Sequence, residues 1–111
     1  MPGEEPRILQ LDPQALAVVE EGMRHAVTDG TCKKLNLSGM NVCAKSGTAE
    51  TGIANEDDHA WVVGYWPREK PAYGFVVFYQ NGGSAGDTAV PTARDLLSFM
   101  RDYDPMSRSS Q

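Results

Sequence analysis

Two apolar runs joined by a short turn set the framework of this 111-residue chain. Residues 60–66 (AWVVGYW) and 72–79 (AYGFVVFY) are rich in the aromatic and β-branched side chains that favour strands. Pro67 ends the first run, and the polar residues 68–71 form a turn. Strands with so short a link pair antiparallel, so we predict a hairpin whose second strand is covered on both faces.

A helix is predicted before the hairpin, over residues 12–29. Asp12 can accept hydrogen bonds from the first turn, and the fixed φ of Pro13 suits the first helical position. Gly30 follows where helices commonly end in a left-handed residue. Apolar side chains recur at helical spacing and should form one buried stripe, comprising Leu16, Val19, Met23, Ala26 and Val27.

A third strand and a second helix complete the framework. Residues 41–49 alternate in character, which is typical of a strand, between polar loops at 31–40 and 51–58. Residues 81–86 form a Gly-rich connection, after which Asp87 or Thr88 should cap the last helix. The stripe expected to face the sheet in that helix comprises Ala93, Leu96, Leu97 and Met100.

The predicted fold class is therefore α+β. A three-stranded antiparallel sheet is flanked by an N-terminal and a C-terminal helix, because both helices need an apolar surface to cover. We expect a single domain over residues 1–111, with an extended lead-in at 1–11, a folded part at 12–103 and a disordered polar tail at 104–111.

Composition excludes several classes of function. The net charge of -5 argues against a nucleic-acid partner, because phosphate binding needs clustered Lys and Arg. No run approaches the ~20 apolar residues of a membrane helix, and the acidic N-terminus is unlike an export signal. Cys32, Cys43, His25 and His59 do not have the spacing of a metal site, so we expect no metal, no cofactor and two free thiols rather than a disulfide.

The segment Lys45-Ser46-Gly47-Thr48-Ala49-Glu50 carries the clearest chemistry. On a strand, Ser46 and Thr48 project from the same face, so both hydroxyls can donate to one carboxylate. Gly47 has no side chain, which lets the backbone of a ligand approach the strand edge. Lys45 points the other way and adds positive potential. This pattern suits a peptide that ends in a free carboxylate.

Several motifs occur in the order found in the penicillin-binding protein transpeptidases. They are Gly30-Thr31 after a helix, KSGTAE at 45–50, HAW at 59–61 and NGG at 81–83. Through them the chain resembles the high-molecular-weight class of that family from about residue 11 to residue 103. The resemblance implies a partial β-lactamase/transpeptidase-like fold.

The resemblance also implies roles for the residues of the Lys45-Ser46-Gly47 box. Ser46, Gly47 and Thr48 would bind the carboxylate end of a D-Ala-D-Ala stem peptide or of a β-lactam. The backbone N–H of Thr48 would be one of the two oxyanion-hole donors. Lys45 would hydrogen-bond the serine of the family's S-x-N motif and help to relay protons.

The nucleophile of that family is missing from these residues. Acylation requires a serine with a lysine three residues later, and none of the seven serines has one; S-x-N is also absent. We therefore interpret the chain as the C-terminal segment of a peptidoglycan D,D-transpeptidase domain, inactive on its own. Its partners would be the stem peptide or a β-lactam and the remainder of the domain.

Other interpretations stay open from the sequence. A β-lactamase or β-lactam sensor also uses a K-[ST]-G strand, and a non-catalytic module could bind peptides or a partner protein. The parent family works outside the cytoplasmic membrane, held there by an N-terminal anchor that these residues do not contain. Glu50 and His59 are candidates for lining the cleft, although a solvated carboxylate and a structural histidine are the simpler interpretations.

Overall fold

The computed structural model describes residues 3–110 and confirms the α+β architecture. Its elements are α1 (Pro13–Thr28), the 3-10 helix η1 (Lys33–Leu35), β1 (Cys43–Ala49), β2 (His59–Trp66), β3 (Tyr73–Tyr79), α2 (Ala89–Tyr103) and the 3-10 helix η2 (Pro105–Ser107). Met1 and Pro2 of the expected lead-in and Gln111 of the expected tail lie outside the described residues.

The sheet has the order β1-β2-β3, and both neighbouring pairs are antiparallel. Ser46 lies opposite Val62, and Val62 lies opposite Val77. Gly64 is required at the centre, because a Cβ there would lie 2.3 Å from the carbonyl oxygen of Cys43 and 2.8 Å from the Phe75 ring. The predicted hairpin is thus confirmed, and β1 is an edge strand beside it.

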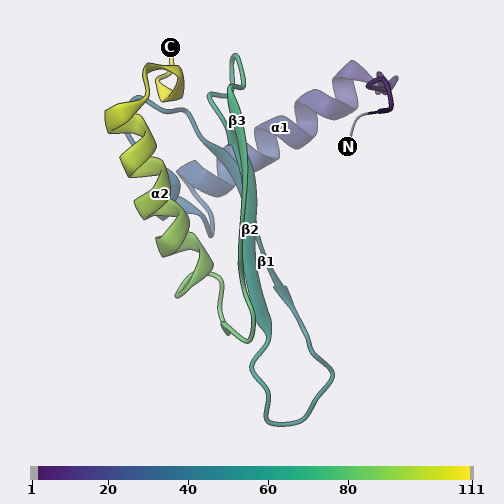
Figure 1. Ribbon diagram of the computed structural model, residues 1–111, viewed down its shortest axis with the longest axis vertical. Coiled ribbons are helices and arrows are strands. Elements are labelled where there is room, and N and C mark those ends of the chain that lie inside the picture. Colours follow the sequence, from purple (N-terminus) through teal and green to yellow (C-terminus); the bar gives the residue numbers. More distant parts are fainter. Residues whose placement is uncertain (1–2, 111) are drawn as a thin grey trace.

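One face of the sheet carries the core. Val62, Trp66 and Phe75 point toward α2, which runs along that face (Figure 1) and buries Ala93 and Leu97 against it. The opposite face is open: it exposes Trp61, Val63, Val76 and Phe78. The expectation that β3 is covered on both faces is therefore wrong for these residues, because no described element lies over its outer side.

Helix α1 begins as predicted, with the Asp12 side chain accepting a hydrogen bond from the N–H of Gln14 at 2.9 Å. Its C-terminal part packs on β1, where Arg24 donates to the Val42 carbonyl at 2.6 Å. Its N-terminal part projects away from the sheet (Figure 1). Within the expected stripe Val27 is buried, whereas Leu16 and Val19 are exposed, since nothing described covers them.

Two local expectations at the helix ends need correction. Gly30 does not have a positive φ; it returns so closely to the helix that a Cβ would lie 2.9 Å from the Cα of Ala26. In α2, whose N-cap is Thr88, Leu96 is 46% exposed, and Ala89 and Val90 are buried in its place. The buried stripe therefore begins a turn earlier than predicted, at Ala89 and Val90, and does not include Leu96.

The segments expected to be polar loop and disordered tail both contribute to the folded structure. Within 31–40, Cys32, Leu35, Leu37 and Met40 are buried, and η1 packs against α2. After α2, residues 105–107 form η2 and bury Ser107, and the N–H of Ser109 donates to the Gly39 carbonyl at 2.7 Å. The tail is held by contacts with distant parts of the chain, which local composition does not reveal.

Candidate functional site

The free edge of β1 is the candidate site, and its backbone direction can be read from two hydrogen bonds. The carbonyl groups of Val42 and Ser46 accept from the side chains of Arg24 and Lys45, at 2.6 Å each, on the side of β1 away from β2. Alternate residues of a strand direct their backbone groups to the same edge. The N–H of Thr48 therefore also points to the free edge.

The two hydroxyl groups of the site lie on the same face of β1. Ser46 is half-buried and Thr48 is exposed, so both can reach a ligand. The Ser46 Oγ lies 2.8 Å from the Oγ of Thr31, a residue in the loop after α1. Sequence reasoning assigned no role to Thr31; the available signal was its place in the Gly30-Thr31 motif.

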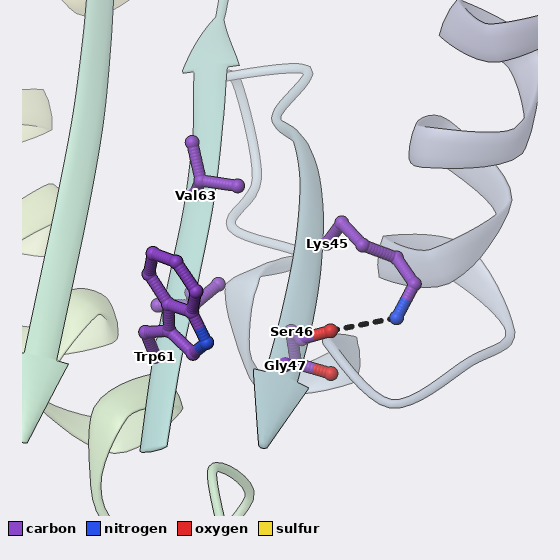
Figure 2. Close-up of a pocket in the computed structure, with 6 residues that line it drawn as sticks. Lys45, Ser46, Gly47, Trp61 and Val63 are labelled. Atoms are coloured by element: carbon purple, nitrogen blue, oxygen red, sulfur yellow. Dashed lines mark hydrogen bonds between the residues drawn. The ribbon is translucent and has the colours of Figure 1, made fainter. Parts of the chain in front are cut away.

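A hollow on the outer side of the sheet is lined by Lys45 and Gly47 of β1 and by Trp61 and Val63 of β2. The Lys45 side chain itself extends past the free edge of β1, away from Trp61 and Val63 (Figure 2). The hollow has a volume of about 220 Å³. Lys45 bends back along the strand, and its Nζ donates to the Ser46 carbonyl (Figure 2). A Cβ on Gly47 would lie 3.1 Å from the Trp61 Nε1, so a larger residue there would press on the indole.

The Thr48 end of the strand has a different electrostatic character. A second hollow there is lined by Glu56, Asp57 and Asp58 of the β1–β2 loop together with Gly83 and Ser84. Three carboxylates repel an anion and favour a cationic group. A carboxylate ligand is therefore better accommodated toward Ser46, where the Lys45 ammonium group lies.

His59 and Glu50 stand at the same end of the sheet. The Nδ1 atom of His59 accepts a hydrogen bond from the N–H of Asn81 at 2.9 Å, and its ring packs on Phe78 with centroids 5.4 Å apart. His59 thus ties β2 to the connection before α2, which favours the structural interpretation. Glu50 is exposed directly after β1. A role for either residue in lining the cleft stays a prediction.

In the part of the chain that the structure describes, the potential metal ligands and the two thiols do not form a second centre. Within residues 3–110, no group of three or more His, Cys, Asp or Glu side chains could hold a metal ion. Cys32 and Cys43 are free and buried. Burial raises the pKa of the Cys43 thiol, although a hydrogen bond with Tyr65 opposes it, so this group is a poor nucleophile at neutral pH.

A family model described as the penicillin-binding protein transpeptidase domain matches residues 3–98 of the chain. The chain belongs to this family. The match includes residues 3–10 of the lead-in, whereas the resemblance based on sequence motifs began at about residue 11. The edge strand with the Lys45-Ser46-Gly47 box is therefore part of a transpeptidase fold.

Individual relatives agree with this assignment. The chain is 30% identical to the peptidoglycan D,D-transpeptidase PbpA of Mycolicibacterium smegmatis over 79% of its length. It is similar in structure to Pseudomonas aeruginosa PBP2, with a TM-score of 0.74, 27% identity and 98% of the chain covered. The ceftriaxone acyl-enzyme complex of penicillin-binding protein A from Mycobacterium tuberculosis gives a TM-score of 0.69 at 27% identity, over 79% of the chain.

The match covers only a part of each relative. The chain spans 19% of the M. smegmatis protein, 24% of the P. aeruginosa chain and 21% of the M. tuberculosis chain. The residues matched by the family model, 3–98, include α1, the three strands and the first part of α2. Among residues 3–110, none of the helices has the length and apolar character required to cross a membrane.

Proposed function

We propose that this chain supplies the substrate-binding strand of a peptidoglycan D,D-transpeptidase domain. Ser46 and Thr48 donate hydrogen bonds to the terminal carboxylate of an acyl-D-Ala-D-Ala peptide, or to the equivalent carboxylate of a β-lactam. Gly47 leaves room for the ligand backbone to run along β1. The N–H of Thr48 is one of two donors to the oxyanion that forms during acyl transfer.

The observation that carries this proposal is the direction of the β1 backbone. The side chains of Arg24 and Lys45 donate to the carbonyl groups of Val42 and Ser46 at the free edge. Thr48 lies two residues after Ser46, so its backbone groups point to the same edge. Its N–H and a hydroxyl pair are therefore available at one edge. A ligand that pairs with this edge and ends in a carboxylate uses both kinds of donor.

The remaining chemistry belongs to residues outside this chain. A serine from the rest of the domain attacks the carbonyl carbon of the penultimate D-Ala; its oxygen forms an ester, the peptide C–N bond breaks, and the terminal D-Ala leaves with a proton. Lys45 hydrogen-bonds a second serine of that part. The complete protein would act on peptidoglycan outside the cytoplasmic membrane.

A non-catalytic module that binds carboxylate-terminated peptides is the second candidate. It is favoured by one observation, namely that none of the serines in the sequence is followed three residues later by lysine. The strand would bind the same ligand in both cases. The two functions differ only in whether a nucleophile joins the site.

The test is acylation by a fluorescent penicillin, followed on denaturing gels. The isolated chain should remain unlabelled, and the complete transpeptidase that carries this segment should be labelled. In the complete protein, Ser46→Ala or Thr48→Val should slow acylation by roughly tenfold to a hundredfold, because each removes a hydrogen bond to a charged group worth about 1.5–3 kcal/mol.

The matched control is Ser98→Ala on α2, which should leave the rate unchanged. Equal rates for Ser46→Ala, Thr48→Val and the unaltered protein would refute the proposed carboxylate site. Labelling of the isolated chain would show that one of its own serines is activated.

A further inference from the structure

Thr31 is an exposed residue whose two neighbours in the chain, Gly30 and Cys32, are both held by backbone hydrogen bonds. The N–H of Gly30 and the N–H of Cys32 both donate to the Ala26 carbonyl, at 3.2 and 2.9 Å. Cys32 is completely buried. Between these two anchors the Thr31 hydroxyl is directed to β1, where its Oγ lies 2.8 Å from the Ser46 Oγ.

Lys45 and Thr31 hydrogen-bond different groups of Ser46. Lys45 Nζ bonds the carbonyl oxygen of Ser46, not its hydroxyl. Across residues 3–110, the hydroxyl of Ser46 has its hydrogen bond with Thr31. Either oxygen of that pair could be the donor, since a hydroxyl both donates and accepts.

A bound carboxylate removes this ambiguity. An ionised carboxylate only accepts, so Ser46 must direct its single proton to the ligand. The Ser46 Oγ is then left with lone pairs, and the Thr31 hydroxyl must be the donor of the pair. Hydrogen bonds arranged in such a chain polarise and strengthen one another.

We propose that Thr31 is a positioning residue of the carboxylate site. Its hydroxyl donates to the Ser46 Oγ and so aims the Ser46 proton at the anionic end of the ligand. This inference rests on the proposed function, because it presupposes that Ser46 binds a carboxylate. It adds a residue from the loop after α1 to a site otherwise built on one strand.

Substitutions in the complete transpeptidase test the inference through the rate of acylation by benzylpenicillin. Thr31→Val removes the hydroxyl and keeps the shape, and it should slow acylation roughly threefold to tenfold, the value of one neutral hydrogen bond. Thr31→Ser keeps the hydroxyl and should restore most of the rate. Thr92→Val is the matched control, since its hydroxyl contacts Tyr79 on the far strand β3, and it should have no effect.

Two further measurements separate positioning from a general structural effect. In a Ser46→Ala background, Thr31→Val should cause no additional loss, because the hydroxyl that it aims is already absent. With the methyl ester of benzylpenicillin, which has no carboxylate, Thr31→Val should react at the rate of the unaltered protein. Thr31→Ala serves as a second hydroxyl-free variant if the valine variant unfolds.

The outcomes distinguish the two proposals. If Ser46→Ala slows acylation and neither Thr31→Val nor Thr31→Ala does, the role of Thr31 is refuted and the carboxylate site stands. An equal loss from Thr31→Val with and without the Ser46 hydroxyl also refutes it. If Ser46→Ala itself does not slow acylation, the proposed carboxylate site is refuted, and the role of Thr31 is refuted with it.

Discussion

The side chains of β1 show how one strand separates two kinds of environment. Ser46 turns to the face where Thr31 lies, whereas Lys45 and Gly47 turn to the face of Trp61. The alternation follows from strand geometry and was predictable from the sequence. The residues that meet each side chain were not, because they come from other segments of the chain.

Gly47 provides a test at this scale. Gly47→Ala places a methyl group against the Trp61 indole, which is 43% exposed and can move aside only by giving up its contact with the strand. We expect a loss of about 1 kcal/mol in the free energy of unfolding, the low end of overpacking, together with a change in tryptophan fluorescence.

The control for that substitution is Gly74→Ala. Gly74 also lies on an exterior strand, but a Cβ there would meet only the Gly64 carbonyl oxygen, at 3.7 Å. Its unfolding free energy and fluorescence should change much less. Equal effects of the two substitutions would show that Trp61 does not constrain Gly47.

Among the elements, those defined by local chemistry were predicted well. Helix α1 begins at Pro13 because Asp12 caps it, and the hairpin forms because two strand-forming runs have a short link. Segments whose order depends on distant partners were not predicted. Leu35 and Met40 are buried by α2 and the sheet although their own spacing follows no helical or strand period.

The segment after α2 was missed for the same reason. Asp104 accepts hydrogen bonds from the Tyr73 hydroxyl and from the N–H of Met106, and the Ser109 hydroxyl donates to Glu69 at 2.7 Å. Tyr73 and Glu69 lie more than thirty positions away in the sequence. The polar composition of residues 104–111 therefore predicted a disordered tail, although polar groups within it have specific hydrogen-bond partners in the fold.

This segment should detach at low pH. The Tyr73 hydrogen bond, and then that of Met106, hold the pKa of Asp104 below its ordinary value. Burial alone would raise the pKa of Glu69, but hydrogen bonds from Asn41 and Ser109 outweigh it and lower the pKa. A lowered pKa means that the stabilising contribution is complete above the ordinary carboxyl pKa, about 4, and is lost as the pH falls through the folded-state values.

Amide hydrogen exchange of Met106, Ser107 and Ser109 measures this detachment. Protection should be constant at neutral pH and should fall below about pH 4 relative to the sheet amides. Asp104→Asn should weaken protection of Met106 already at neutral pH. Protection that follows the sheet amides through the acid range would contradict the assignment of these anchors.

At the scale of the whole molecule, the bare surfaces agree with a segment taken from a larger domain. The outer sheet face exposes Val76 and Phe78, and α1 exposes Leu16 and Val19. The chain spans no more than a quarter of the relatives compared with it. Contiguous apolar surface of this kind promotes association with other surfaces.

We therefore expect the isolated chain to self-associate. Sedimentation velocity should show a concentration-dependent shift to larger species, and the double substitution Val76→Thr with Phe78→Ser should reduce it. Ile53→Thr removes a single exposed aliphatic side chain, 63% exposed in the β1–β2 loop, and should leave the association unchanged. Monomeric behaviour of the unaltered chain at high concentration would show that these faces do not drive association.

The most direct test of the proposed carboxylate site on β1 is an NMR titration of the 111-residue chain, kept below the concentration at which it associates. An acyl-D-Ala-D-Ala peptide with a free carboxylate should shift the amide signals of Ser46, Gly47 and Thr48, and that of Thr31. The same peptide capped as a C-terminal amide should leave them in place. Equal shifts with both peptides, or shifts confined to the outer face around Trp61, would contradict a carboxylate site on β1.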